Sequence, residues 1–366
     1  MATTGTATES RDAADLASDL HDAELVRVVS RADGDGLAAA TILGDALADR
    51  DIPRHLSLAP SRNRVAPRLE GDDTAIVLGF PDFEQSCNAE SAATCAFEMA
   101  QELGTDPDPG LALAGGTVAG VRAQDPALSA AQDRGLTQRP GLAIPTADMA
   151  TGLAYTGWLH AEFSGDEAAT SEFVADLDLP EPMNERGHRM VASAVALEAT
   201  DTLPSERATK AIANAVGPRT TPTAFETIGG YADVLNAAAK MDAGAALASL
   251  LTGAESRLLE MWQVYGAKVH EVVAELPQTE TPVQTATVEG IPPDDVARLG
   301  RDFRVPADQI YVEGPETIAL ATREETAIET LENRVPEAAV SGTNTLATVR
   351  TDADLETILT DTEAGQ

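Results

Sequence analysis

Two aspartates, Asp33 and Asp35, stand two residues apart in a glycine-containing loop at residues 30–37. Gly34 and Gly36 allow the backbone to turn sharply, and carboxylates spaced this way in an extended segment can point in the same direction. Such a pair suits a hard or borderline divalent cation, with a phosphate held by the metal and by the N-terminus of a following helix. The residues alone equally allow an Asp/Gly turn that only caps the helix.

A calcium-binding EF-hand loop is excluded by its own spacing. A loop that starts at Asp33 would need a polar ligand at position 37 and a glutamate at position 44. The chain has Leu37 and Gly44 there.

The elements on both sides of the loop predict how it is positioned. Residues 25–29 form a short apolar run, and the apolar residues of 37–50 repeat with helical spacing. Residues 55–59 and 74–80 are predicted as two further strands, and the second is apolar throughout, as expected of a strand buried on both faces. Strands that alternate with helices predict a parallel sheet with chemistry at the carboxyl ends of its strands.

The loop resembles the first motif of the DHH phosphoesterase superfamily of RecJ-like nucleases, His-x-Asp-x-Asp-Gly. Residues 31–36 keep both aspartates and the glycine, but Arg31 replaces the histidine. The resemblance implies an α/β fold with an N-terminal parallel-sheet DHH domain, a helical connector and a small C-terminal α+β DHH-associated domain. Residues 1–20 are rich in Ala, Thr, Ser and Asp and are predicted as a flexible leader or a peripheral helix. The resemblance divides the rest of the chain into a DHH-like domain at 21–200, a helical connector at 201–276 and a DHH-associated-like domain at 277–366.

Most of the metal ligands that the family uses are missing from this sequence. Asp82 lies too far along to replace the second-motif aspartate, and no Asp-His-His stands between Phe80 and the predicted helix at 91–103. Gly120 stands near the fourth-motif aspartate, with Asp125 as a weak substitute. A two-metal phosphoesterase needs about four or more ligands, and the motifs supply Asp33 and Asp35 alone. The histidines are scattered: His21, His55, His160, His188 and His270.

Other family elements keep their places with changed residues. Residues 154–166 resemble a segment of archaeal RecJ-like proteins, with an amphipathic strand and turn as the plain alternative. Residues 231–240 resemble the Leu-Asn-Ala-x-Gly-Arg element, with Lys240 as either a weakened phosphate contact or a solvated helix lysine. The family's Gly-Gly-Gly-His loop corresponds to residues 341–345. The resemblance therefore gives these candidate phosphate or nucleic-acid contacts: Gly36, Lys240, Ser341, Gly342 and Asn344.

The rest of the chain is predicted from its spacing. The apolar residues of 245–276 repeat with helical spacing, which is typical of core packing and suits a long connector. Beyond a linker at 277–282, the α+β unit is predicted to contain strands at 283–288, 310–312, 317–322 and 340–349, with helices at 292–300, 323–333 and 353–360.

Acidic residues outnumber basic residues by 60 to 25, which gives a net charge of −35 with three lysines in the chain. Acidic residues spread over the whole sequence indicate a solvating surface in a high-salt cytoplasm, so we expect a halophilic archaeal source. This charge argues against tight, independent DNA binding, although it allows a locally basic channel. No run approaches 18 apolar residues and no signal sequence is seen, so a cytoplasmic protein without a membrane partner is expected. Cys87 and Cys95 are predicted as reduced structural thiols.

Three functions fit these observations. The first is a catalytically inactive RecJ-like scaffold that needs no cofactor, similar to the inactive DHH-fold subunits of replicative helicases that bind GINS and the MCM ring. The alternative is a divergent phosphoesterase or single-strand-specific exonuclease, with Mn²⁺ or Mg²⁺ at Asp33 and Asp35 and further ligands such as Asp82 or Asp125. The third is a nucleotide sensor that uses residues 33–37 as an anion cradle. Single-stranded DNA is expected to bind weakly.

Overall fold

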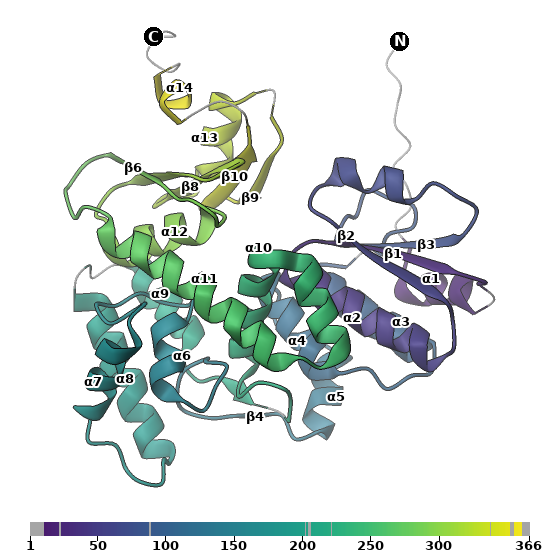
Figure 1. Cartoon of the computed structure of the whole chain (residues 1–366), viewed down its shortest axis with the longest axis horizontal. Coiled ribbons are helices and arrows are strands. Elements are labelled where there is room, and N and C mark those ends of the chain that lie inside the picture. Colours follow the sequence, from purple (N-terminus) through teal and green to yellow (C-terminus); the bar gives the residue numbers. More distant parts are fainter. Residues whose placement is uncertain are drawn as a thin grey trace. The chain divides into compact units, whose positions relative to one another are not determined.

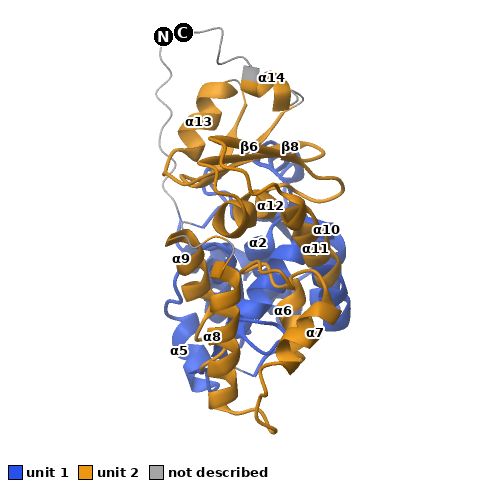
Figure 2. Ribbon diagram, turned by 90° about the vertical axis from the view of Figure 1, so that its left-hand side faces the viewer, with its two compact units in different colours: residues 1–139, 143–147, 218–262 blue, residues 140–142, 148–217, 263–366 orange. Residues whose placement is uncertain are grey.

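The computed structural model describes residues 11–360, apart from Asp22, Asn88, Thr202, Pro204, Ser205, Thr221, Glu337 and 352–354. The chain divides into two compact units (Figure 2). Unit 1 comprises residues 1–139, 143–147 and 218–262, and unit 2 comprises residues 140–142, 148–217 and 263–366. Both units are discontinuous in sequence, so these bounds differ from the continuous domains predicted with boundaries at residues 200 and 276.

Unit 1 contains the predicted parallel sheet, in the order β2-β1-β3 (Figure 1). The central strand β1 (Val26–Arg31) pairs in parallel with β2 (Arg54–Ala59) on one side and with β3 (Thr74–Leu78) on the other. The prediction of an α/β fold with an N-terminal parallel sheet is confirmed. Because parallel strands end at one edge, the loops after β1 and β3 emerge together.

Helix α2 (Gly34–Asp49) follows β1 and packs against three other helices of unit 1. These helices are α3 (Ala92–Glu102), α4 (Pro109–Val118) and α10 (Ile228–Thr252). Most α2 residues are buried because small residues dominate its sequence, which lets its neighbours approach closely. Shorter elements complete the unit: η1 (Arg62–Arg64), η2 (Ala66–Arg68), α5 (Ala127–Asp133), β4 (Thr137–Gln138) and β5 (Arg219–Thr220).

Helix α10 is long and apolar enough, by length and composition, to cross a membrane. Within unit 1 it instead packs as a core helix on α2 and α4. Its backbone leaves helical geometry at Asp242, whose carboxylate caps the second half by accepting from Ala245 N at 3.0 Å. Gly253 then ends the helix in a left-handed conformation, which glycine adopts without strain.

Residues 13–20 form a helix, one of the two forms predicted for the leader, but this helix is buried and not peripheral. Helix α1 (Ala13–Leu20) begins at an Asp12 cap and buries Leu16 and Leu20 completely. It packs on α3, so residues 13–20 belong to the core of unit 1. Residues 1–10 lie outside the described part of the chain.

Unit 2 contains four helices from the middle of the chain: α6 (Met149–Tyr155), α7 (Glu167–Ala175), α8 (Glu185–Asp201) and α9 (Glu206–Ala215). Helix α11 (Glu255–Glu275) begins in unit 1 and ends in unit 2. The strand predicted as one interpretation of residues 154–166 is absent among the described residues. There, the end of α6 is followed by turns.

The C-terminal part of unit 2 is the expected small α+β region. Its five-stranded sheet has the order β6-β7-β8-β10-β9, with β6 parallel to β7 and all other pairs antiparallel. The predicted strand at 340–349 is a hairpin, because a turn at Asn344 and Thr345 separates β9 from β10. The elements are β6 (Val283–Thr287), α12 (Asp294–Leu299), a π-helical turn (Gly300–Arg304), β7 (Gln309–Glu313), β8 (Thr317–Thr322), α13 (Ala327–Arg334), β9 (Val340–Thr343), β10 (Leu346–Arg350) and α14 (Leu355–Thr360).

Candidate functional site

Asp33 caps helix α2. Its backbone is extended, and one carboxylate oxygen accepts a hydrogen bond from Gly36 N at 2.8 Å. Since the helix starts at Gly34, Asp35 is already in the first helical turn. The expectation that both carboxylates point the same way from an extended segment is therefore wrong, because capping uses the first aspartate and helix formation turns the second away.

Asp35 is buried, with 1% of its surface exposed, and it joins α2 to α3. Its carboxylate accepts from Ser91 Oγ at 2.7 Å, from Ala92 N at 2.8 Å and from Ala93 N at 2.9 Å. Both oxygens are engaged in these bonds. Burial raises the pKa of the Asp35 carboxyl above its ordinary value, and the three hydrogen bonds oppose that rise. The carboxylate thus satisfies the N-terminus of a helix.

Arg31 brings a positive charge to the place of the family histidine. Its Nε donates to the second oxygen of Asp33, and an Nη lies 3.4 Å from Gly79 O at the end of β3. The guanidinium therefore neutralises one of the two carboxylates that the sequence offers for a metal ion.

Gly36 is required by close packing. A Cβ at this position would lie 2.0 Å from Arg31 O. The Gly36 carbonyl accepts a hydrogen bond from Ser30 Oγ at 2.7 Å. Its amide already donates to Asp33. The predicted role of Gly36 as an anion donor thus competes with a bond that the fold itself uses.

A cavity of about 200 Å³ remains beside these residues. Its lining includes Arg31, Asp35, Ser91 and the backbone of the loop after β3. Cys87 and Cys95 also line it, and they form a disulfide. The predicted reduced thiols are therefore wrong: Cys95 on α3 holds the β3–α3 loop at Cys87, a contact that a spacing of eight residues did not reveal.

The substitute ligands lie apart from this pair and have other partners. Asp82 is exposed and pairs with Arg62 at 3.1 Å, while Asp125 accepts from Ser129 N at 3.1 Å near the start of α5. Over the described residues, no group of three or more His, Cys, Asp and Glu side chains could hold a metal ion.

The predicted phosphate contacts lie in both units. Lys240 is half-buried on α10 of unit 1 and interacts with other groups of the chain. Ser341, Gly342 and Asn344 belong to the β9–β10 hairpin of unit 2, where Ser341 Oγ lies 3.1 Å from Thr348 Oγ1. Asn344 O accepts from Ala327 N at 2.7 Å, which fixes the hairpin to α13.

Two histidines that the sequence analysis treated as scattered meet in unit 2. His160 and His270 are buried, with their Nδ1 atoms 3.0 Å apart, and His270 Nε2 lies 3.0 Å from Thr156 O. If His270 Nε2 donates to that carbonyl, neutral His270 accepts at Nδ1 from His160. Burial lowers the pKa of His160 to about 3 and that of His270 to about 4. Nothing in their 110-residue separation indicates this pair.

The sequence of a haloarchaeal protein decides the family. Over 298 aligned residues the chain is 35% identical to the uncharacterised protein rrnAC1427 of Haloarcula marismortui. The alignment covers 80% of this chain and 79% of that protein. The chain belongs to the rrnAC1427 family. No family model matches it.

Among solved structures, RecJ of Thermus thermophilus in complex with Mn²⁺ is similar to this rrnAC1427 family member with a TM-score of 0.51 at 16% identity. The match covers 98% of this chain and 54% of that RecJ, so the chain spans about half the length of the bacterial protein. CDC45 from Entamoeba histolytica gives a TM-score of 0.49 at 7% identity, over 92% of this chain and 95% of that one. This member of the rrnAC1427 family has a RecJ-like DHH fold.

The fold family implies a metal ion, and the donors of this rrnAC1427 family member do not fit one. Asp35 gives its oxygens to three N–H and O–H donors, and Asp33 gives its oxygens to an amide and a guanidinium. A divalent cation prefers several oxygen or imidazole ligands that are free of competing cations. The positively charged guanidinium of Arg31 pairs with Asp33 and would compete with a metal ion for it.

Proposed function

We propose that this chain is a RecJ-like protein without phosphodiesterase activity that serves as a structural subunit of a larger assembly. The observation that supports the proposal most strongly is the use of Asp33 and Asp35 by the fold. Asp33 caps α2 and pairs with Arg31, and Asp35 accepts hydrogen bonds from the first two amides of α3. Both carboxylates therefore have structural roles that need no bound metal ion.

Phosphodiester hydrolysis at a two-metal centre needs ligands that hold two ions about 4 Å apart and lower the pKa of a bound water. Asp33 and Asp35 already accept hydrogen bonds from other groups of the fold, and Asp82 and Asp125 have partners of their own. The side chains available as metal ligands therefore support the proposal that the chain keeps the fold for a purpose other than phosphodiester hydrolysis.

The expected partners follow from the resemblance to inactive DHH-fold helicase subunits, which implies GINS and MCM. A scaffold role also suits the charge. With a net charge of −35, the chain repels phosphate backbones, and molar salt weakens the remaining contacts further. Single-stranded DNA is expected to bind weakly, and protein partners carry the role.

A nuclease assay tests the loss of activity. The purified full chain is incubated with labelled single-stranded DNA and Mn²⁺ or Mg²⁺ in molar KCl, beside Asp33→Ala and the control Asp49→Ala, at an exposed acid of the same helix. The proposal expects no metal-dependent cleavage by any of the three. Cleavage by the wild type and by Asp49→Ala that is lost in Asp33→Ala would overturn it and favour the divergent phosphoesterase.

Assembly is tested separately. Purified GINS and MCM from the same organism are mixed with the full chain in molar KCl and run on a size-exclusion column. Co-elution supports the partner assignment. Separate elution of all three, with each protein folded, counts against these partners and leaves the result of the nuclease assay unaffected.

A further inference from the structure

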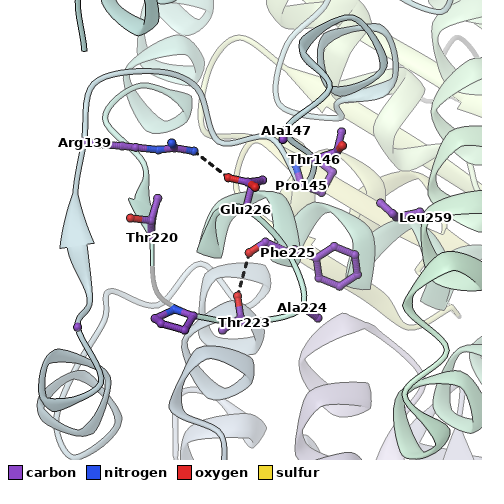
Figure 3. Close-up of a pocket in the computed structure, with 12 residues that line it drawn as sticks. Arg139, Pro145, Thr146, Ala147, Thr220, Thr223, Ala224, Phe225, Glu226 and Leu259 are labelled. Carbon is purple, nitrogen blue, oxygen red and sulfur yellow. Dashed lines mark hydrogen bonds and ion pairs between the residues drawn. The ribbon is translucent and has the colours of Figure 1, made fainter. Parts of the chain in front are cut away.

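Unit 1 contains a second and larger cavity, of about 600 Å³, away from the first-motif loop. This volume falls within the range of small-molecule binding sites. Two stretches of the chain form most of its wall, one with Gly135, Arg139 and residues 145–147 and the other with Thr220 and residues 222–226, and Leu259 of α11 completes it (Figure 3).

The wall is fixed by hydrogen bonds between these two stretches. Strands β4 and β5 pair through Thr137 and Thr220, and Glu226 N donates to Pro145 O at 3.1 Å. Thr227 Oγ1 donates to Ile144 O at 2.8 Å. A cavity held in this way is formed before any ligand arrives, so binding costs little ordering of the chain.

Arg139 and Glu226 are the two charged residues of the lining, and they form an ion pair at 3.2 Å. Figure 3 shows the Arg139 side chain extending from the left toward Glu226, while Leu259 lies at the right of the view. More than a third of each charged side chain is exposed, at 35% and 41%, so water screens the pair and its net contribution is small.

The hydrogen-bonding capacity of this pair is unequal. Arg139 Nε is buried and lies out of reach of a ligand, so the arginine offers a ligand its Nη groups. A guanidinium binds an oxyanion best through two N–H groups, whereas the recorded contact with Glu226 uses one Nη. Glu226, in contrast, can turn into water. The arginine therefore keeps Nη N–H groups that can donate to a ligand.

Apolar side chains also line the cavity. Ala147, Pro222 and Ala224 are exposed and Leu259 is half-buried, while the Phe225 ring is buried beneath them against Tyr231 at a centroid distance of 4.7 Å. The cavity therefore offers a positive group together with small apolar surfaces.

We propose that this cavity binds a small organic oxyanion, a carboxylate or a phosphate ester with an apolar body, whose charged group displaces Glu226 from Arg139. The negative net charge of the chain does not oppose this at high salt, because the Debye length in molar salt is about 3 Å and the groups within the cavity dominate.

Isothermal titration calorimetry of the full chain in molar KCl tests the proposal. Benzoate and phenyl phosphate are the anionic probes, and benzamide is the neutral counterpart of benzoate. We expect a dissociation constant of about 1 mM for at least one anion, as is usual for a ligand of this size, and at least about tenfold weaker binding of benzamide. The tighter anion identifies carboxylate or phosphate as the natural group.

Three variants locate the site. Arg139→Gln should weaken binding of the anion about tenfold or more, Glu226→Gln should tighten it about threefold, and Arg219→Gln, an exposed arginine on the adjoining strand, should leave it unchanged. If Arg139→Gln fails to fold, the result with Glu226→Gln decides. Equal binding of benzoate and benzamide, no binding of either anion at about 20 mM, or unchanged affinity in both pocket variants would overturn the proposal.

Discussion

The carboxylate of Asp35 accepts a 2.7 Å hydrogen bond from the hydroxyl of Ser91, 56 residues further along the chain. Together with two amides at the start of α3, this bond turns a residue of a metal-binding motif into a structural link between two helices. The same atoms cannot serve both roles, because ligand oxygens that accept three hydrogen bonds have little capacity left for a cation.

Asp35→Ala should lower the free energy of unfolding by about 3 kcal/mol, because it leaves two amides and a hydroxyl buried without acceptors. Denaturant unfolding in molar KCl with a chelator measures the loss. Asp49→Ala, at an exposed acid of the same helix, should change stability by less than about 0.5 kcal/mol. If Asp35 were a metal ligand, its removal in chelator would relieve repulsion and leave stability equal or higher.

Two substitutions of Asp33 distinguish a helix-capping role from a metal-binding role. Asparagine caps helices as well as aspartate does, so Asp33→Asn should stay within about 0.5 kcal/mol of the wild type, while Asp33→Ala should lose about 1 kcal/mol. Thermal unfolding with and without Mn²⁺ checks both values. A midpoint that rises with Mn²⁺ in the wild type and not in Asp33→Asn would contradict the capping role.

The buried histidine pair predicts a loss of stability in acid. The pKa values of His160 and His270 lie at about 3 and about 4 in the folded chain, below the ordinary 6.5. Between pH 6.5 and about 4 the unfolded chain therefore takes up protons that the folded chain does not. Each histidine then lowers the free energy of unfolding by about 1 kcal/mol per pH unit as the pH falls.

Comparison of variants isolates this effect from the many carboxylates of the chain. His160→Gln should reduce the slope of unfolding free energy against pH over pH 4.5–6 by about half of the pair's contribution. His55→Gln, at an exposed position on β2, is the matched control. Equal slopes in the wild type and in His160→Gln would show that the pair does not control acid stability.

The disulfide between Cys87 and Cys95 closes a short loop beside the first-motif cavity. Its loss in Cys87→Ser/Cys95→Ser should lower the free energy of unfolding by about 2 kcal/mol, since the unfolded chain regains the entropy of an open loop. Mass spectrometry after alkylation without reductant should find both thiols blocked from the reagent. Complete alkylation of the untreated, unfolded protein would refute the bond.

Salt should stabilise this chain strongly. Sixty acidic residues against 25 basic ones repel one another across the surface, and raising the salt from about 0.1 M to 1 M shortens the Debye length from about 10 Å to about 3 Å. The unfolding midpoint should rise steadily over this range. The relative in Haloarcula marismortui fits this expectation, whereas a midpoint independent of salt would not.

The sequence by itself determined the elements around the first motif. The apolar run before the loop, the helical spacing after it and the apolar strand predicted at 74–80 each specify their own backbone, so β1, α2 and β3 formed where predicted. Their bounds differ, because α2 begins at Gly34 within the predicted loop and β3 ends at Leu78. The loss of family ligands was also visible, because it depends on residue identity alone. The hairpin at 340–350 was predicted as one strand because a two-residue turn of Asn344 and Thr345 carries little signal.

The tertiary structure alone decided what the remaining groups do. Asp35 meets Ser91, Cys87 meets Cys95, His160 meets His270 and Arg139 meets Glu226, and three of these four pairs span more than 50 residues. Local spacing cannot specify such contacts, because they arise only when helices and loops pack against one another. Once buried, a carboxylate or an imidazole must find a partner, and that requirement assigned Asp35 to the fold.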